Sequence, residues 1–489
     1  MTLPERPHLS GADPGLLAAV ARGEARLTPD QALAAFHRVP LIELGRLADA
    51  RCRSLHAGSL RTYVIDRNIN YTNVCNARCT FCAFRRDGHE HDAYTLSVEQ
   101  ILEKIEALVA IGGTQILMQG GMNPALPLDW YTTLLSTIKS RFPRVHVHAF
   151  SPPEMIEFVH FFDPPGDTLF EKVRWVLVRL KDAGLDSLPG GGGEIFAPAV
   201  RRKIGLGKCD ADAWLTTMYA AHSLGMFTSA TMMFGHIEGV ADRVHHMLLV
   251  RQWQDKALGA GTPAQAGATA FGHYVSFISW PFQRENTPLG RVPNWGADEA
   301  ELAREFPGDA VARAWDFGRA ERSALPPGAR EADFIDYEAL DRAQYPTAHL
   351  FGKRVRMSGS TDYLRTQALS RLFLDNVYSI GASWVTMGPH IGQVALTFGA
   401  NDMGSVMMEE NVVSSAGTTY CLDEPVLCRL IREAGFTPAQ RNNTYDVLSL
   451  KDSPDAPDRR VSDWARHRVQ RLHVQAPKSS TVPVTIAGR

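Results

Sequence analysis

Three cysteines, Cys75, Cys79 and Cys82, lie in the stretch "YTNVCNARCTFCAF" at the spacing C-x3-C-x2-C, with no fourth cysteine nearby. A closed zinc site takes four ligands in a tetrahedron, and an ordinary iron–sulfur cluster takes four thiolates. Three ligands therefore leave one metal position open for a ligand from outside the protein. The chain has 7 cysteines in all, and the others are scattered without ligand spacing, so we expect a single metal centre.

A vacancy of this kind has a known use in iron–sulfur chemistry. A 4Fe-4S cluster held by three thiolates binds the amino and carboxylate groups of S-adenosylmethionine at its free iron and passes one electron to the sulfonium. The spacing, with the aromatic Phe81 directly before Cys82, resembles the signature of the radical SAM superfamily. We therefore predict the cluster and S-adenosylmethionine as cofactors, with Phe81 in the cofactor site. A zinc knuckle is the alternative, and it would need His89 or His91 as the fourth ligand.

Two glycine-rich stretches each follow an apolar run that is typical of a strand. The resemblance to the superfamily implies that Gly120, Gly121 and Met122, in "QILMQGGMNP", hold the methionyl amino group of the cofactor. In "LPGGGGEIF" the glycines end at Gly193 and lack the Lys-Ser/Thr of a phosphate loop. Glycine there would let the backbone approach a cofactor closely, and Glu194 could accept a hydrogen bond from a ribose hydroxyl or a substrate group. A plain tight turn is the alternative.

The elements that must position these residues alternate between short apolar runs and amphipathic helices. Thr28 is a predicted N-cap in the helical segment that opens the chain, and Ser97 is a predicted N-cap for the helix "SVEQILEKIEALVAIGG". The alternation predicts an α/β fold, a TIM-type (β/α)8 barrel in which the chemistry lies at the carboxyl ends of the strands. The candidate strands are "NINYTNV", "GTQILMQGG", "VHVHAFS", "DSLPGGGGEIF", "TSATMMFGHIE", "HYVSFISW", "SIGASWVTMG" and "QVALTFGAND".

The composition limits the domain plan and the partners. A net charge of -2 gives no electrostatic reason to expect nucleic acid or an anionic membrane. No apolar run is long enough for a membrane span and no signal peptide is evident, so we expect a cytoplasmic protein with reduced thiols. The predicted parts are an N-terminal helical segment (1–59), the first part of the barrel (60–290), an insertion (291–358), the last part of the barrel (359–449) and a partly disordered extension (450–489).

A closer resemblance rests on a series of motifs from about residue 60 to 447: "VIDRNINYTNVCNARCTFCAF", "HVHAFSPPE", "LPGGGGEI", "ATMMFGHIE", "SWPFQRENT" and "FGANDMGSVMMEENVVSSAG". They resemble the cyclic dehypoxanthine futalosine synthases, radical SAM enzymes of the futalosine route to menaquinone. The resemblance implies an oxidoreductase that cyclises dehypoxanthine futalosine and needs a one-electron donor of the flavodoxin or ferredoxin type. Aminofutalosine synthase and the radical SAM enzymes that make the deazaflavin chromophore share parts of the series and are the alternatives.

The candidate catalytic residues lie near the ends of later strands. His146 and His148 alternate on one strand, so both side chains point to the same face. We predict that His148 is catalytic and that Ser151 and Glu154 bind the cofactor; a hydrogen-bonded core histidine is the alternative. The H-x-H pattern also occurs in divalent-metal hydrolases with a barrel fold, but that function would leave the cysteine triplet unexplained.

Three further residues complete the predicted catalytic set. His236 ends the strand "ATMMFGHIE", and Asp402 and Glu410 belong to the last barrel unit. Carboxylates and imidazoles at strand ends can orient a substrate or accept a proton. Solvated or ion-paired side chains are the alternative for each of them.

Overall fold

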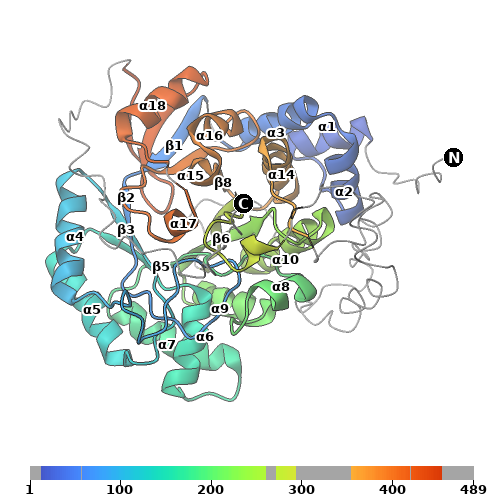
Figure 1. Cartoon of the computed structure of the whole chain (residues 1–489). Coiled ribbons are helices and arrows are strands. Elements are labelled where there is room, and N and C mark those ends of the chain that lie inside the picture. Colours follow the sequence, from blue (N-terminus) through green and yellow to red (C-terminus); the bar gives the residue numbers. More distant parts are fainter. Residues whose placement is uncertain are drawn as a thin grey trace, which may run out of the picture.

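The computed structural model describes residues 13–56, 58–259, 271–292, 294, 354–418 and 420–453. Three helices come first, namely α1 (Pro14–Arg22), α2 (Pro29–Arg38) and α3 (Leu41–Leu55). Thr28 caps α2 in a capping box with Gln31, as the sequence predicts. Helix α2 packs on α10 (Val240–Leu258) and α14 (Ser360–Phe373), α3 packs on α14, and α1 packs on α3. The amino-terminal segment thus covers one side of the barrel (Figure 1).

A single sheet closes into the predicted barrel. Its order is β11-β10-β1-β9-β8-β7-β6-β5-β4-β3-β2. β1 (Leu60–Val64) pairs with β9 (Asp402–Ser405), and β2 (Asp66–Ile69) pairs with β3 (Gln115–Met118), with only Ile65 between β1 and β2. We count β1 and β2 together as one stave, that is, as one strand position of the barrel. With β3 to β9 this gives eight staves, and every pairing among them is parallel.

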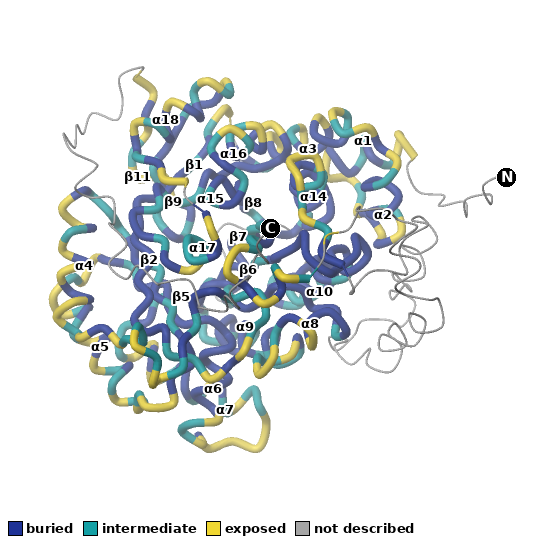
Figure 2. Tube along the Cα trace, in the orientation of Figure 1, coloured by how far each residue is buried: buried dark blue, intermediate teal, exposed yellow. Residues whose placement is uncertain are grey.

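The remaining staves and their helices follow the βα alternation. The strands are β4 (His146–Ala149), β5 (Ser187–Leu188), β6 (Phe227–Phe234), β7 (Tyr274–Pro281) and β8 (Ser379–Gly381). The helices are α4 (Val98–Ala110), α5 (Leu128–Arg141), α6 (Pro152–Phe162), α7 (Leu169–Asp182), α8 (Pro198–Ile204), α9 (Ala211–Ser223), α15 (Trp384–Met387), α16 (Pro389–Ala395), α17 (Val412–Ser415) and α18 (Glu424–Glu433), with the short 3-10 helix η1 (Leu289–Arg291). Figure 2 shows the strands buried at the centre and the exposed residues on the outer faces of the helices.

Four strand predictions are wrong in their bounds. "NINYTNV" overlaps β2 only at Asn68 and Ile69, and "SIGASWVTMG" contributes Ser379–Gly381 before helix α15 begins. Within "QVALTFGAND" the first residues end helix α16, and the strand begins only at Asp402. The short apolar run Val394, Ala395 and Leu396 imitates a strand, because periodicity cannot separate helix from strand over so few residues. Similarly, "DSLPGGGGEIF" contributes only Ser187–Leu188 to the sheet, and its glycines form a loop.

A carboxyl-terminal hairpin lies outside the eight staves. β10 (Thr437–Arg441) runs parallel to β1, and β11 (Val447–Leu450) returns antiparallel to β10. The loop between them carries Asn443 and Tyr445 into contact with the amino ends of barrel strands. Most of the predicted insertion at 291–358 and of the extension at 450–489 lies outside the described residues. In the described part of the chain, no helix has the length and apolar character needed to cross a membrane.

Candidate active site in the barrel

The cysteine loop follows β2 and is held in shape by its own backbone. The Cys75 N–H donates to the Arg86 carbonyl at 3.1 Å, and the Arg86 N–H donates to the Asn73 carbonyl at 2.8 Å. The buried Arg86 guanidinium also donates to the Ala83 carbonyl at 3.1 Å. Arg86 therefore folds the loop and is not available to a substrate carboxylate. Its neighbour Arg85 donates to the Cys75 carbonyl at 3.1 Å.

The three thiols are close enough to influence one another electrostatically. Burial raises the pKa of Cys79 to about 12 and also raises the pKa of Cys75. Binding of a cluster must therefore release protons from these thiols. No three His, Cys, Asp or Glu side chains of the described residues are grouped to hold one metal ion. A 4Fe-4S cluster does not need three side chains around one metal ion, because each of its thiolates binds a different iron. The three thiols of this loop therefore fit such a cluster.

The glycines after β3 bring the cysteine loop close to the barrel. A Cβ on Gly121 would lie 2.1 Å from the Val74 carbonyl oxygen, and one on Gly120 would lie 2.5 Å from the Tyr71 ring. Next along the chain, the Met122 carbonyl accepts the Asn76 N–H at 3.1 Å. Only glycine permits this approach, and the end of β3 and the cysteine loop are thereby joined as one unit.

Glu154 ties that unit to the first turn of α6. One oxygen of its buried carboxylate accepts the Tyr71 hydroxyl at 2.7 Å and the Gly120 N–H at 3.1 Å. The other accepts the Ser151 N–H at 2.7 Å and the Ser151 hydroxyl at 2.6 Å. Glu154 and Ser151 thus lie beside the predicted cofactor glycines, and their hydrogen bonds fix the shape of that site.

The glycine loop after β5 lies next to this cofactor site. Gly193 lies so close to β6 that a Cβ would be 2.5 Å from the Thr231 carbonyl oxygen. The buried Arg201 donates to the Gly193 carbonyl at 2.8 Å and so clamps the loop. Glu194 adopts a positive φ of 40° and accepts a hydrogen bond from Lys208 at 2.5 Å. Although burial opposes it, the Glu194 carboxylate raises the pKa of Lys208 above its ordinary value.

Lys208 connects this loop to the cysteines. Its ammonium lies 5.1 Å from the centre of the Phe81 ring, and its charge acts on the Cys79 thiol. Phe81, Glu194 and Lys208 therefore meet at the side of the cavity where a cluster would be held.

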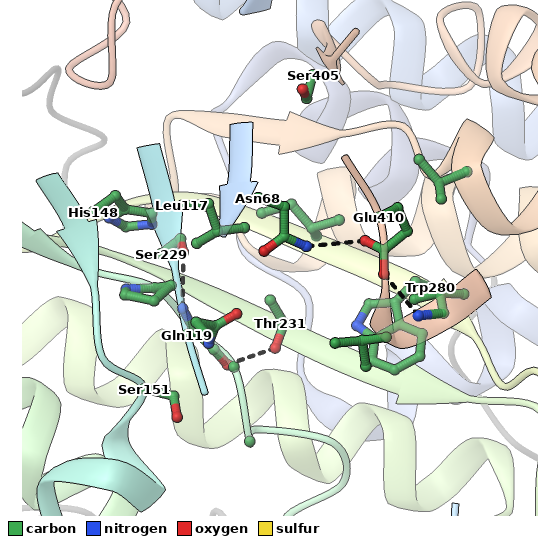
Figure 3. Close-up of a pocket in the computed structure, with 18 of the residues that line it drawn as sticks. Asn68, Leu117, Gln119, His148, Ser151, Ser229, Thr231, Trp280, Ser405 and Glu410 are labelled. Atoms are coloured by element: carbon green, nitrogen blue, oxygen red, sulfur yellow. Dashed lines mark hydrogen bonds between the residues drawn. The ribbon is translucent and has the colours of Figure 1, made fainter. Parts of the chain in front are cut away.

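One cavity of about 480 Å³ runs from the cysteine loop down the inside of the barrel (Figure 3). Of the predicted residues, it is lined by the three cysteines, Phe81, Gly120, Gly121, Met122, His148, Ser151, Glu154, Glu194, Asp402 and Glu410. Gly193 lies in the adjoining glycine loop. The barrel thus brings nearly the whole predicted set to one enclosed space.

The floor of the cavity is polar. Asp402 forms a buried, two-point ion pair with Arg441 of β10, at 2.6 and 2.9 Å, and it accepts hydrogen bonds from Thr62 at 2.5 Å and from the Gly404 N–H at 2.8 Å. The Tyr445 ring lies under the Arg441 guanidinium, 4.0 Å from centroid to carbon. Asp402 therefore closes the amino end of the barrel, where its hydrogen-bonding capacity is taken up by the protein.

His148 belongs to a second group on the same floor. Its Nδ1 lies 2.6 Å from the Ser187 hydroxyl, which is also 2.6 Å from His146 Nε2. Asn443 donates to Ser187 at 3.0 Å and lies 2.9 Å from His146. Burial lowers the pKa of His148 to about 3, so this imidazole is neutral at physiological pH and is a weak base.

Glu410 approaches the cavity from the loop that precedes α17 (Figure 3). It accepts hydrogen bonds from the Asn68 amide at 3.0 Å and from the Val413 N–H at 2.7 Å. Burial raises the pKa of its carboxyl, which makes the carboxylate a stronger base than an exposed one.

The neighbouring Glu409 points away from the cavity and anchors the loop. It accepts from Arg67 at 2.6 Å and from Lys104 at 2.8 Å in a buried ion triad. The position of Glu410 therefore depends on a charge cluster behind β2.

His236 is separate from the rest. It is buried beside Glu238, with Nδ1 3.1 Å from the carboxylate, and it does not line the cavity. Arg243 lies 2.9 Å from the same carboxylate and 2.9 Å from Asp362 of α14. The structure thus places His236 in a buried charged cluster that is separate from the cavity.

Several residues of the site lack a motif in the sequence. Arg201 and Lys208 fix the cofactor end, while Arg441 and Asn443 form the floor. Basic residues soon after a glycine run could have indicated Arg201 and Lys208. No local pattern indicates Arg441 or Asn443, because a hairpin after the last barrel strand brings them in.

Comparisons with known families agree with this arrangement. The sequence model of the radical SAM superfamily matches residues 69–250, and the model described as the CofH/MqnC C-terminal region matches residues 345–454. The first match contains the cysteine loop and both glycine stretches. The second contains Asp402, Glu410 and the floor residues of the hairpin.

Curated relatives match almost the whole chain. It is 34% identical over 445 residues to the cyclic dehypoxanthine futalosine synthase of Halalkalibacterium halodurans, covering 91% of this chain and 97% of that protein. The protein of the same name from Streptomyces coelicolor is 33% identical, covering 90% and 91%. The 5-amino-6-(D-ribitylamino)uracil--L-tyrosine 4-hydroxyphenyl transferase of Methanopyrus kandleri is 33% identical, covering 80% and 85%.

Solved structures share the fold. Methylornithine synthase (PylB) superposes with a TM-score of 0.54 at 15% identity, covering 86% of this chain and 97% of its own. The FeFe-hydrogenase maturase HydG from Carboxydothermus hydrogenoformans superposes with a TM-score of 0.52 at 14% identity, covering 88% and 80%. At these identities the likeness concerns the fold alone.

Proposed function

We propose that this chain, which belongs to the radical SAM enzymes of the CofH/MqnC type, cyclises dehypoxanthine futalosine to cyclic dehypoxanthine futalosine. The observation that carries the proposal is the extent of the match. Relatives with the cyclase name align with 90% and 91% of this chain, whereas the transferases of Methanopyrus kandleri and Thermosynechococcus vestitus align with 80% and 84%. Percentage identity does not separate the two groups.

The cofactors of this family are a 4Fe-4S cluster and S-adenosylmethionine. When bound, they supply a primary carbon radical by one-electron cleavage of the sulfonium. Cys75, Cys79 and Cys82 would hold the cluster. The unit formed by Gly120, Gly121, Met122, Ser151 and Glu154 would hold S-adenosylmethionine next to it.

The residues of the cavity have three tasks in the proposed reaction. The cavity walls exclude water, so that the ribose hydrogen of the substrate is the one removed. They hold the aromatic ring of the substrate over the resulting ribose carbon, so that a carbon–carbon bond can form within the molecule. A base then takes the proton that the ring loses as it regains its aromaticity. The electron lost in the same step would need an acceptor, such as the oxidised cluster that the three cysteines would hold.

We assign the positioning and proton-accepting role to Glu410 rather than to His148. Burial makes the Glu410 carboxylate more basic and the His148 imidazole less basic. His148 would then contact the substrate as a neutral polar group. The reaction also needs a one-electron donor, for which we propose a flavodoxin or ferredoxin in the cytoplasm, where thiols stay reduced.

The test is a substrate comparison with anaerobically reconstituted protein, S-adenosylmethionine and dithionite. Separate incubations contain dehypoxanthine futalosine, the precursor used by aminofutalosine synthase, or L-tyrosine with 5-amino-6-(D-ribitylamino)uracil. We expect deoxyadenosine, and a cyclic product two hydrogens lighter than the substrate, only in the first. Turnover of tyrosine with the uracil would instead identify a 4-hydroxyphenyl transferase, and turnover of the precursor alone an aminofutalosine synthase.

A further inference from the structure

The turn after α8 lies directly on the cysteine loop. The Arg78 N–H donates to the Leu206 carbonyl at 2.8 Å, and the Thr80 N–H donates to the Ile204 carbonyl at 2.8 Å. Arg78 and Thr80 are the two neighbours of Cys79 in the chain. Gly207 packs against the same loop, since a Cβ there would be 3.5 Å from the Ala77 α-carbon. Two backbone hydrogen bonds therefore lead from this turn to the residues on either side of a cluster ligand.

The outer side of this turn is exposed and basic. Arg202 and Lys203, at the end of α8, are exposed, and the Arg78 side chain is 70% exposed. Asp87 on the cysteine loop is paired with Arg85 and lies 3.7 Å from Arg78. The apolar Leu206, whose carbonyl accepts the Arg78 N–H, is 48% exposed on the same turn. Figure 2 shows exposed residues along α8 on the outside of the molecule.

An apolar centre with a charged rim is the usual anatomy of a transient protein interface. The chain as a whole carries a net charge of -2, so the positive charge here is local. Such a patch attracts an acidic protein and raises its association rate without requiring tight binding. Radical formation in this family begins with one electron delivered to the cluster. A carrier protein that docks close to the cysteine loop would deliver this electron over a short distance.

We propose that Arg78, Arg202, Lys203 and Leu206 form the docking surface for an acidic one-electron carrier protein, with the backbone contacts to Arg78 and Thr80 leading from that surface to the cluster ligand Cys79. The proposal rests on the radical SAM chemistry and is independent of which substrate is cyclised.

The experiment measures reduction of the reconstituted cluster in the full-length protein. Reduced flavodoxin is the probe, and the bimolecular rate of cluster reduction is followed by stopped-flow absorbance at several salt concentrations. In the double variant Arg202→Glu/Lys203→Glu we expect the rate at low salt to fall by about tenfold or more, and its salt dependence to flatten. Cluster reduction by dithionite should change little, because a small reductant needs no docking surface.

Arg144→Glu is the matched control, since this exposed arginine precedes β4 at the opposite end of the barrel. It changes the net charge of the chain but should leave the flavodoxin rate near that of the parent. The proposal is wrong if the double variant keeps the parental rate and salt dependence. It is also wrong if Arg144→Glu lowers the flavodoxin rate as much as the double variant does, once each fall is divided by the change in net charge. An equal fall with dithionite would also contradict it, because the defect would then lie in the cluster itself.

Discussion

Two carboxylates of the last barrel unit show how burial and partners divide the work of similar residues. Asp402 accepts hydrogen bonds from Arg441, Thr62 and Gly404, so it is fully engaged in holding the floor. Glu410 has two hydrogen-bond partners, lines the upper cavity and has a raised pKa. The two residues should therefore respond differently to the loss of charge.

Glu410→Gln should separate radical formation from its use. The cofactor end of the cavity is built from other strand ends, so S-adenosylmethionine should still be cleaved to deoxyadenosine. A misplacement of the substrate by about 1 Å can cost about a hundredfold in rate. We expect the ratio of deoxyadenosine to cyclic product to rise accordingly, measured with dithionite as reductant. An unchanged ratio, with both products lowered together, would mean that Glu410 does not act on the substrate.

Asp402→Asn provides the comparison, because it should act on the fold. Removing one partner of a buried ion pair costs about 3–5 kcal/mol, since the remaining charge stays buried without its counter-ion. We expect a clear fall in the melting temperature of this variant and a smaller one in Glu410→Gln, as measured by calorimetry. If Asp402→Asn instead keeps its melting temperature and shows the uncoupled ratio, this carboxylate contacts the substrate.

Among the elements, the junction between β3 and the cysteine loop sets the cofactor end of the cavity. The loop forms only isolated bridges and no regular strand or helix, so its position depends on contacts with its neighbours. The end of β3 supplies them through Gly121 and the Met122 carbonyl, and α6 adds the Glu154 carboxylate.

Gly121→Ala should damage cluster binding while leaving the barrel folded. The new methyl group would lie 2.1 Å from the Val74 carbonyl oxygen and 2.9 Å from the Cys75 β-carbon, so the loop must move away from β3. We expect reduced iron content after reconstitution, loss of the brown absorbance and little deoxyadenosine. Gly359→Ala is the control, because no atom lies within 4 Å of its added Cβ. Full iron content in Gly121→Ala would show that the junction tolerates displacement.

In the molecule as a whole, the sheet closes around the site because β1 and β2, which pair with opposite ends of the strand order β9 to β3, follow each other directly in the chain. β1 lies between β9 and β10, so segments from both ends of the described chain meet at one side of the barrel. The hairpin loop that follows β10 then closes the amino end with Asn443 and Tyr445. The packed core of this fold also buries several histidines, and burial lowers their pKa.

Acid should destabilise the folded protein below about pH 6.5. Burial lowers the pKa of His56, His148 and His222 to about 3, so the native state stays unprotonated while the unfolded chain takes up protons as the pH falls below 6.5. Each such histidine lowers the unfolding free energy by up to about 1.4 kcal/mol per pH unit between pH 6.5 and 3. We expect the melting temperature to fall from pH 7 to pH 5.

His222→Gln tests the origin of that fall, because His222 is buried against Thr228, away from the cavity. Parent and variant carry the same cluster, so the difference between their pH profiles reports the histidine. The variant should lose less melting temperature between pH 7 and pH 5. Identical slopes would mean that this histidine binds its proton in the folded state as well.

The sequence by itself was enough to predict the chemistry and the fold class. Ligand spacing, glycine runs and the βα alternation are local patterns that follow from covalent geometry and periodicity, so the open-site cluster loop, the glycines after β3 and the barrel could be predicted from the chain alone. The capping boxes of Thr28 and Ser97 are local in the same sense, and both are present.

Only the tertiary structure decided which polar residues share the cavity. His236 and His148 look equivalent as strand-end histidines, yet His236 pairs with Glu238 away from the cavity, whereas His148 lines it. Asp402 and Arg441 lie 39 residues apart and meet because β9 and β10 both flank β1. Such contacts depend on strand order, register and the path of a hairpin, and these are set by packing across the whole chain, which no short stretch of sequence encodes.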